Sequence, residues 1–469
     1  MVNINDFMGK TLHFTGIGGS SMSGLARLMK SRGYIVRGSD RSASYLTEAL
    51  EADGISVIIG QVAENIHGAD LVIFTAAAAE DNAERVEAKR LGIPSMERKY
   101  LLGQISNAYS KSVAISGTHG KTTTTAMLAQ TLVEAGMDPN IHIGGVLDAI
   151  NGSVRTGNDD IFITEADEFA RSFLELNPTI SIILNIDADH LDIYRDIDEI
   201  QATFLQFAKR LPDDGLLIVC GDDDRCVQVA KDSGRKYITF GSSSDFDYHF
   251  ENEKMNERAC LSFDVLRKGK CANEASSYEN LGRISLSVPG MHSVIDCLAV
   301  FACADAMGVD TKAIIEALSH FKGAHRRFEL TGVVDGVQLY HDYSHNPSEY
   351  KTVVPIAAVL PHNKLYVVFQ PHTYSRAKAL IGDFGASFAG ADEVLVTDIY
   401  AAREVDPGDI NSHMLMEKMQ GFGYETVYCP GFDECEEYLR ANWKQGDIVL
   451  TVGCGNINIL NDILAGKNK

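Results

Sequence analysis

Short apolar runs alternate with helical periodicity along almost the whole chain, and this alternation constrains the fold more than any other feature of the sequence. The runs at residues 12–15, 112–116 and 365–369 have the length and apolar character of buried strands. Strands that alternate with helices predict parallel sheets covered by helices on both faces. The sequence therefore predicts an α/β protein that binds its ligands beyond the carboxyl ends of the strands.

The length of the chain predicts more than one domain. At 469 residues it exceeds what a single hydrophobic core usually supports. A polar stretch at residues 106–111 is typical of a linker, and a second boundary follows the helical pattern at residues 311–320. We expect a Rossmann-like domain over residues 1–108, a central ATPase-type domain with a phosphate loop and a mostly parallel sheet over 109–325, and a Rossmann-like domain over 326–469. Residues 242–278 are expected to form edge strands and loops.

Charge and composition exclude several classes of protein. The 42 lysines and arginines are outnumbered by 64 aspartates and glutamates, and no basic run is present, so we expect no nucleic-acid partner. No signal-like segment and no apolar stretch of about 18 residues occurs, which predicts a cytoplasmic protein without membrane insertion. The nine cysteines include no C-x-x-C pair, which argues against a zinc knuckle and a disulfide framework.

A glycine-rich turn between a strand and a helix predicts a nucleotide-binding site. It follows the strand at residues 112–116 and precedes a helical pattern that ends near Gly136. Glycines allow backbone N–H groups to approach phosphate oxygens, a lysine adds a point charge, and a threonine can bind Mg²⁺. Ile115 stands where the strict Walker pattern has glycine, so the loop is a shortened variant. The candidate residues for ATP are Gly117, Thr118, His119, Gly120, Lys121, Thr122 and Thr123.

Acidic clusters follow two further strands and predict a magnesium site. Glu165 comes directly after the strand at residues 161–164, and a cluster ending in His190 closes the apolar run at residues 180–186. Mg²⁺ prefers hard oxygen ligands and keeps several waters. We expect Thr122, Glu165 and His190 to bind it. Spacing leaves open whether Asp167, Glu168, Asp187 or Asp189 takes part, and a solvated acidic loop is the alternative.

A second glycine turn near the N-terminus imitates a dinucleotide fingerprint. Gly16, Gly18 and Gly19 follow the strand at residues 12–15, and Asp40 lies about twenty residues further on. Ser21 occupies the position of the third glycine. A diphosphate fits such a helix start, so the turn suits a UDP-sugar as well as NAD.

Taken together, these motifs resemble the Mur ligase family over essentially the whole chain. The resemblance is carried by the segments at residues 13–19, 39–40, 117–125, 165–168, 189–192, 325–329, 342–343, 369–372, 374–376 and 399–404. It implies three α/β domains that bind, in order, a UDP-sugar, ATP and an amino acid. It also implies that ATP phosphorylates the substrate carboxylate and that the amine of the amino acid attacks the acyl phosphate.

The resemblance assigns roles residue by residue. For the UDP-sugar it implies Gly16, Gly18, Gly19, Ser23, Ser39, Asp40, Thr75 and Arg98. To the ATP site it adds His292, Arg327 and Asp342, and as catalytic residues it implies Lys121, Glu165, His190, Arg327, His345, His372 and Arg376. The chain departs from the usual family pattern at Ser293, Asp296, Asn346, Thr373 and Asn456.

Within this family the motifs favour an ATP- and Mg²⁺-dependent ligase that joins L-alanine to UDP-N-acetylmuramate in peptidoglycan precursor synthesis, as a monomer or weak homodimer. Two alternatives remain: a murein-recycling ligase of the same family that adds a tripeptide, and a non-catalytic paralogue that binds the UDP-sugar. A nicotinamide-dependent oxidoreductase would leave Lys121, Glu165 and Arg327 without a role.

Overall fold

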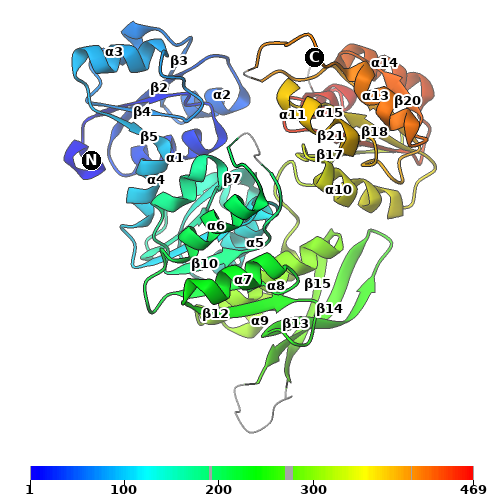
Figure 1. Ribbon diagram of the computed structural model, residues 1–469, viewed down its shortest axis with the longest axis horizontal. Helices are drawn as coiled ribbons and strands as arrows, with labels where there is room; N and C mark the ends of the chain where they lie inside the picture. Colours follow the sequence, from blue (N-terminus) through cyan, green and yellow to red (C-terminus); the bar gives the residue numbers. More distant parts are fainter. Residues whose placement is uncertain (1, 190–192, 270–277, 403, 468–469) are drawn as a thin grey trace. The chain divides into compact units, whose positions relative to one another are not determined.

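The computed structural model describes residues 2–189, 193–269, 278–402 and 404–467. Its strands form three sheets, and the predicted α/β class is confirmed (Figure 1). By internal contacts the chain divides into two compact units. The first comprises residues 1–253, 262–286 and 291–321, and the second comprises residues 254–261, 287–290 and 322–469.

The first sheet is parallel and has the strand order β3-β2-β1-β4-β5. This order, with β1 in the middle, places the glycine turn after β1 at the carboxyl edge of the sheet. The elements are η1 (Ile4–Phe7), β1 (Thr11–Thr15), α1 (Ser20–Ser31), β2 (Ile35–Asp40), α2 (Tyr45–Ala52), β3 (Ser56–Ile59), η2 (Ala63–Ile66), β4 (Leu71–Phe74), α3 (Ala83–Leu91), β5 (Ser95–Glu97) and α4 (Arg98–Ser106).

The second sheet has ten strands in the order β15-β14-β13-β12-β11-β10-β6-β9-β7-β8. Its strands from β12 to β7 pair in parallel, while β7 and β8 are antiparallel. The elements are β6 (Lys111–Ser116), α5 (Lys121–Glu134), β7 (Asn140–Leu147), η3 (Asp148–Ile150), β8 (Gly152–Arg155), β9 (Ile161–Glu165), η4 (Phe169–Glu175), β10 (Ile180–Ile183), α6 (Ile197–Ala208), β11 (Leu216–Cys220), α7 (Asp224–Ser233), β12 (Lys236–Gly241), β13 (Tyr248–Met255), β14 (Cys260–Lys268), β15 (Tyr278–Pro289), α8 (Met291–Ala306) and α9 (Thr311–His320).

The strand expected over residues 180–186 is shorter than the apolar run suggested. β10 ends at Ile183 because the backbone then turns toward the phosphate loop, where the N–H of Thr118 donates to the carbonyl of Asn185 (3.2 Å). Within residues 242–278, expected to form edge strands and loops, lie β13 and β14, and the edge strand β15 begins only at residue 278.

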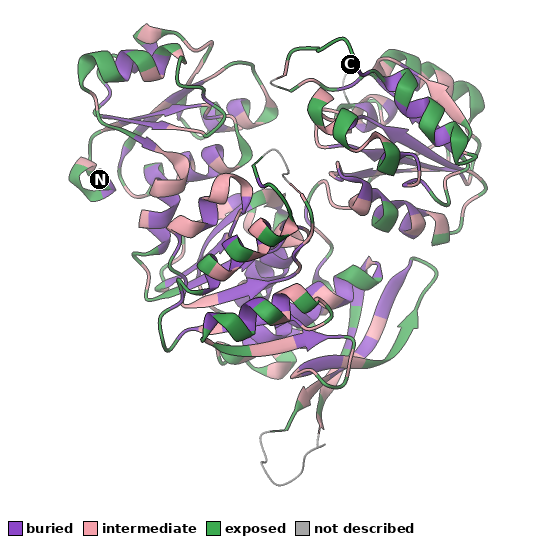
Figure 2. Cartoon of the chain, in the orientation of Figure 1, coloured by how far each residue is buried: buried purple, intermediate pink, exposed green. Residues whose placement is uncertain are grey.

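The third sheet has the order β16-β17-β21-β18-β19-β20 and is parallel except for the β16–β17 pair. The elements are β16 (Glu329–Val334), β17 (Val337–Asp342), α10 (Pro347–Val359), β18 (Leu365–Phe369), α11 (Tyr374–Ala379), α12 (Ile381–Phe384), β19 (Glu393–Val396), α13 (Ser412–Gly421), β20 (Thr426–Tyr428), α14 (Phe432–Asn442), β21 (Ile448–Val452) and α15 (Asn458–Leu464). The central strands of each sheet are buried (Figure 2).

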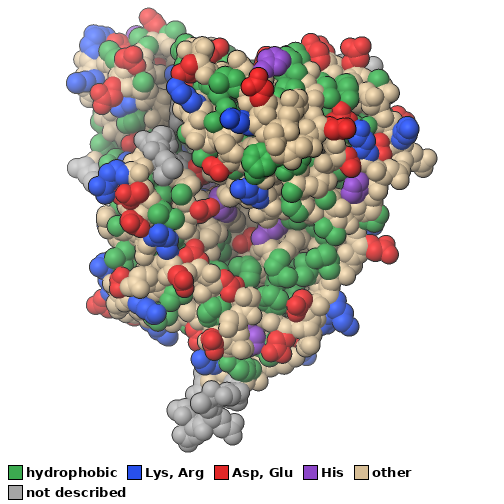
Figure 3. All heavy atoms as spheres, turned by 45° about the vertical axis from the view of Figure 1, so that its right-hand side comes forward, with side chains coloured by type: hydrophobic (Ala, Val, Ile, Leu, Met, Phe, Trp, Pro, Cys, Tyr) green, Lys and Arg blue, Asp and Glu red, His purple; other side chains and the backbone are tan. Residues whose placement is uncertain are grey.

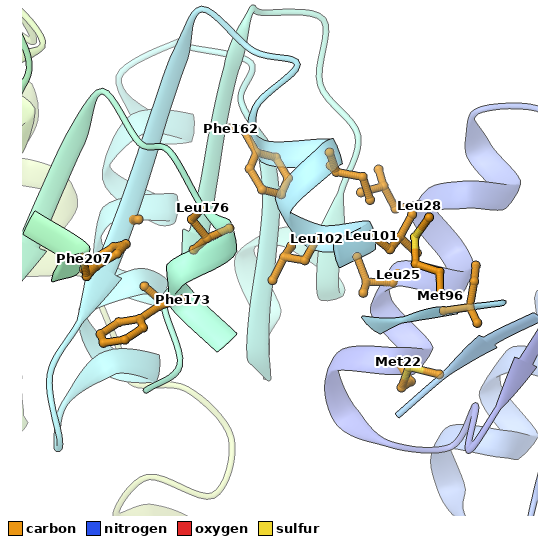
Figure 4. Close-up of a cluster of buried hydrophobic side chains, with 14 of the residues drawn as sticks. Met22, Leu25, Leu28, Met96, Leu101, Leu102, Phe162, Phe173, Leu176 and Phe207 are labelled. Atoms are coloured by element: carbon orange, nitrogen blue, oxygen red, sulfur yellow. The ribbon is translucent and has the colours of Figure 1, made fainter. Parts of the chain in front are cut away.

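One hydrophobic core runs through the first and second sheets (Figure 4). Leu25 and Leu28 on α1 join it to Leu101 on α4. In the central part, the rings of Phe173 and Phe207 stack at 4.6 Å between centroids. Apolar burial stabilises by about 25 cal/mol per Å², so this shared core ties the two sheets into one compact unit.

Candidate active site

The phosphate loop has the predicted form of strand, glycine turn and helix start. β6 ends at Ser116, and α5 begins at Lys121 with Gly120 as its N-cap. Gly120 has φ of +84°, which favours glycine. A Cβ atom at Gly117 would lie 2.9 Å from the Cβ of Leu184, so that position also has no room for a side chain. The N–H groups at the start of α5, from Gly120 onward, lie at the helix N-terminus, where they suit an anion.

Lys121 has a partly buried side chain, and its ammonium group is held in place by acceptors. Its Nζ donates to the carbonyls of Gly117 (2.6 Å) and Thr118 (3.1 Å) and forms an ion pair with Glu168 (2.8 Å). Burial disfavours the charged lysine, but the nearby carboxylates, Glu168 foremost, outweigh that effect and raise the pKa of Lys121. The lysine is thus a fixed positive charge at the loop.

Glu165 ends β9 beside the start of α5. Its Oε2 accepts a hydrogen bond from the hydroxyl of Thr122 (3.1 Å), and its Oε1 accepts one from the N–H of Gly144 (2.6 Å). A threonine hydroxyl and a carboxylate in contact form a hard oxygen pair of the kind that Mg²⁺ uses together with waters. Within the described residues no cluster of three or more His, Cys, Asp and Glu side chains forms a metal site. The third expected ligand, His190, lies outside the described residues.

Two residues after β10 brace the phosphate loop. The side chain of Asn185 accepts from the N–H of His119 (2.8 Å), and the N–H of Asp187 donates to the hydroxyl of Thr118 (2.9 Å). His119 Nε2 lies 3.3 Å from Asp187 Oδ2, and this contact, the largest cause, lowers the pKa of Asp187. Of the acidic candidates left open by spacing, Glu168 and Asp187 therefore contact loop residues. Nothing in the sequence indicated that Asn185 contacts the phosphate loop.

Asp296 is a buried carboxyl group directly behind the phosphate loop. A Cβ atom at Gly120 would lie 2.9 Å from its Oδ1. Burial raises the pKa of Asp296 from 3.8 to about 7. His292, at the start of the same helix α8, is exposed.

Replacing Asp296 by asparagine is expected to stabilise the protein at alkaline pH. The folded state holds its proton while the unfolded carboxyl ionises near pH 4, so the stability contributed by this group is lost as pH rises from about 4 to about 7 and then stays constant. Between pH 5 and pH 8 the loss is on the order of 3 kcal/mol. Denaturant unfolding of parent and Asp296→Asn at pH 5 and pH 8 measures it. A gap between the two proteins that does not widen from pH 5 to pH 8 contradicts the buried carboxyl.

The glycine turn after β1 is closed by Asp40. Its Oδ2 accepts from the N–H of Gly18 (2.8 Å), and a Cβ at Gly18 would meet the same oxygen at 2.9 Å. Gly16 has φ of +80° and lies against Thr75. The structure thus brings Gly16, Gly18, Asp40 and Thr75 together, with Gly19 as the N-cap of α1. The side chains of Ser23 and Ser39 are fully buried.

In the second unit, the candidate residues lie at the carboxyl ends of β17 and β18. Asp342 ends β17, and its carboxylate accepts from the N–H groups of Phe328 (2.7 Å) and Ser344 (2.8 Å). Desolvation by burial, the largest cause, raises the pKa of Asp342. The guanidinium of Arg327 lies 5.0 Å from the ring centroid of Tyr343.

His345, His372 and Arg376, which the family resemblance implied as catalytic residues, lie close together. The rings of His345 and His372 are 6.3 Å apart, and an Arg376 Nη1 atom lies 3.4 Å from His372 Nδ1. The ring of His372 also stacks on Tyr400 at 5.8 Å. An arginine beside two imidazoles offers a fork for a carboxylate and groups that can accept a proton.

Several departures from the family pattern have structural roles. Asn346 caps α10 in a capping box with Glu349. Asn456 accepts a hydrogen bond from the side chain of Gln370 (2.9 Å). Thr373 stands at the N-cap of α11 with φ of +63°, and its side chain makes no capping hydrogen bond. The fold therefore accommodates these departures next to the strand ends that carry His372 and Arg376.

The distribution of charge on the surface and the lengths of the helices are relevant to nucleic-acid and membrane partners. On the face drawn in Figure 3, basic side chains are interspersed with acidic ones. Among the described residues, no helix is both long and apolar enough to cross a membrane.

Comparisons with known proteins match the chain from end to end. Family models match at residues 11–110 (Mur ligase family, catalytic domain), 115–304 (Mur ligase middle domain) and 326–455 (Mur ligase, glutamate ligase domain). The chain is 43% identical over 98% of its length to UDP-N-acetylmuramate--L-alanine ligase of Caldanaerobacter subterraneus, 98% of which is covered. It is 46% identical over 96% of its length to the enzyme of that name from Clostridium novyi, 95% of which is covered.

Two solved structures share this fold over 98% of the chain. The crystal structure of UDP-N-acetylmuramate-alanine ligase from Thermotoga maritima has a TM-score of 0.84 at 29% identity, with 99% of it covered. A murein peptide ligase from Psychrobacter arcticus has a TM-score of 0.74 at 23% identity, with 98% of it covered. The phosphate loop, the Glu165 strand end and these full-length matches lead to one conclusion: the chain belongs to the Mur ligase family.

Proposed function

We propose that the protein is an ATP-dependent ligase that joins L-alanine to the carboxylate of UDP-N-acetylmuramate in peptidoglycan precursor synthesis. The observation that carries this proposal is the pairing of a charged Lys121 with the Thr122–Glu165 contact at one helix start. Such a site serves phosphoryl transfer, where positioning and charge neutralisation supply most of the catalysis. The named relatives with this reaction cover nearly the full chain.

In the proposed reaction, a carboxylate oxygen of UDP-N-acetylmuramate attacks the γ-phosphorus of ATP, and the bond to the β-phosphate oxygen breaks to release ADP. The amine nitrogen of L-alanine then attacks the acyl carbon. The tetrahedral intermediate expels inorganic phosphate, and the amine gives up a proton. Lys121 and the backbone N–H groups from Gly120 to Thr123 hold the phosphates, while the N–H groups of Thr118 and His119 bond Asn185 and fix the shape of the loop. Arg327 neutralises charge on the transferred group.

A magnesium ion fits the hard oxygen pair of Thr122 and Glu165, with His190 as the further proposed ligand. Bound there, it would neutralise phosphate charge during the transfer. The side chains of Thr122 and Glu165 are already in contact, so the chain holds two proposed metal ligands in place before the ion binds.

We propose the functional division that the sequence suggested: residues 1–108 for the UDP-sugar, 109–325 for ATP and 326–469 for the amino acid. Gly16, Gly18, Gly19, Ser23, Ser39, Asp40, Thr75 and Arg98 serve the UDP-sugar, and His292 and Asp342 serve ATP. In the third part, His345 and His372 orient the amine or accept its proton, and Arg376 binds the carboxylate of the amino acid. The reaction is placed in the cytoplasm, in a monomer or weak homodimer.

Replacing Arg376 by lysine keeps the charge but removes the two-donor fork, so KM for L-alanine is expected to rise by about 10-fold or more. KM for ATP should stay within about twofold, since the phosphate loop is unchanged. Initial rates at varied L-alanine and varied ATP measure both. Lys378→Arg, on the exposed part of the same helix α11, is the matched control. An unchanged dependence on L-alanine in Arg376→Lys removes Arg376 from the amino-acid site.

The test of the function itself compares substrates. The protein is incubated with UDP-N-acetylmuramate, ATP and Mg²⁺, with L-alanine, other amino acids or the murein tripeptide as acceptor, and phosphate release is measured. We expect release with L-alanine. Release only with the tripeptide identifies the recycling ligase, and binding of UDP-N-acetylmuramate without turnover identifies the non-catalytic paralogue. Thermal protection by NAD and not by UDP-N-acetylmuramate overturns the proposal.

A further inference from the structure

We propose that His142 is a positioning residue that couples the UDP-sugar turn to the strand that presents Glu165. The inference rests on the proposed function, and it assigns a role to a buried histidine outside the expected site. His142 lies on β7, at the junction between the two sheets of the first unit.

His142 bridges helix α1 and strand β9. Its Nε2 lies 3.1 Å from the hydroxyl of Ser21 and 3.3 Å from the carbonyl of the same residue, and its Nδ1 lies 3.2 Å from the hydroxyl of Thr164. With its proton on Nδ1, the ring donates to the hydroxyl of Thr164, whose own hydrogen remains for the carbonyl of Glu165. Nε2 then accepts from the hydroxyl of Ser21. The imidazole therefore needs no water to join the two elements.

Both ends of this bridge continue into the candidate sites. At one end, Arg98 donates to the hydroxyl of Ser21 (2.9 Å), and Ser21 belongs to the first turn of α1, directly after the glycine turn. At the other end, Thr164 immediately precedes Glu165 and donates to its carbonyl (3.2 Å). A continuous set of hydrogen bonds thus connects a proposed UDP-sugar residue to a proposed metal ligand.

Strand β7 also holds Glu165 directly. Two residues beyond His142, the N–H of Gly144 donates to Glu165 Oε1 (2.6 Å). A shift of α1 that moves His142 would therefore also displace Glu165. The displacement would pass through Thr164 and through the backbone of β7. α1 packs closely here, since a Cβ at Gly24 would lie 3.3 Å from the His142 ring and 2.7 Å from Val154.

His142 is neutral in this setting. Burial, the largest cause, lowers its pKa to about 4, and the charge of Arg98 acts in the same direction. The backbone contact with Ser21 opposes both. The neutral imidazole of His142 can therefore fix the position of α1 relative to β9 without adding a charge near the proposed phosphate site.

A purely structural tie is the competing explanation, and the chain offers a control for it. At the opposite end of α1, the hydroxyls of Ser31 and Thr156 lie 2.9 Å apart and join the same helix to the segment after β8. This bond is exposed and far along the helix from the glycine turn. Ser31→Ala removes a tie between the same parts of the chain without touching the proposed relay.

The experiment measures coupling in the full-length protein. Calorimetry gives the Kd for UDP-N-acetylmuramate with and without a non-hydrolysable ATP analogue and Mg²⁺, in the parent, His142→Val, His142→Gln, Ser21→Ala and Ser31→Ala. We expect the parent to bind the UDP-sugar about 5-fold or more tightly when the analogue is present. In His142→Val and Ser21→Ala this ratio should fall to within about twofold of one, and Ser31→Ala should keep the parent ratio.

The double variant Ser21→Ala/His142→Val should lose no more coupling than either single variant, because the two residues act through one contact. Retention of part of the ratio in His142→Gln, which can still bond Ser21, supports the relay. A parent without coupling, or a His142→Val protein that keeps the parent ratio, overturns the inference while ligation stands. Failure to bind UDP-N-acetylmuramate or the ATP analogue at all overturns the proposed function instead.

Discussion

Lys121→Ala is expected to reduce ligation by about 10³-fold or more, with binding of UDP-N-acetylmuramate within about twofold of the parent. The variant loses the charge that the loop offers to the ATP phosphates. It also leaves Glu168, whose side chain is 4% exposed, without its ion-pair partner beside the loop. Phosphate release measures turnover, and calorimetry measures UDP-sugar binding, which we propose to involve the first sheet.

A second variant tests whether the Glu168 carboxylate causes the loss of activity in Lys121→Ala. In Lys121→Ala/Glu168→Gln both charges of the ion pair are removed, so repulsion between the Glu168 carboxylate and the phosphates is gone while the lysine contact with the phosphates is still missing. Activity should stay near the level of the single variant. Recovery toward the parent rate would mean that Lys121 only neutralises Glu168, and the lysine would then leave the phosphate-binding set.

Glu165→Gln should lower kcat by about 10²-fold or more and shift the Mg²⁺ dependence to higher concentration. Glutamine keeps the shape and can still accept from Gly144 or Thr122, so the variant changes the charge at the ligand position and little else. Rates measured over a Mg²⁺ titration show both effects. Glu134→Gln, at the other end of α5, is the matched control and should behave as the parent. An unchanged Mg²⁺ dependence in Glu165→Gln excludes it as a metal ligand.

Much of the candidate site could be predicted because its signals are local. Gly120 and Lys121 are read from a strand, a turn and a helix start that are contiguous in the sequence. Glu165 is predictable from its place at a strand end, since the carboxyl ends of parallel strands share one edge. His372 and Arg376 follow from the same rule after β18.

Other residues of the site depend on contacts between distant segments and carry no local signal. Asn185 braces the loop from 66 positions away, and Ser21 meets His142 across 121 positions. The length of β10 was overestimated for the same reason: the apolar run continues to residue 186, while the loop contacts turn the backbone away after Ile183. Asn346 departs from the family pattern beside the candidate active-site residues, and the structure explains it as the N-cap of α10.

The core shared by the first and second sheets has a consequence for cooperativity. Leu101 and Leu102 of α4 pack in the same cluster as Phe162 and Phe173, so neither sheet keeps a complete apolar interior once the other melts. The first 321 residues, apart from the two short segments that belong with the second unit, should therefore lose their structure in one transition. The second unit has cores of its own. The linker near residue 109 thus separates the two proposed ligand sites without separating two folding units.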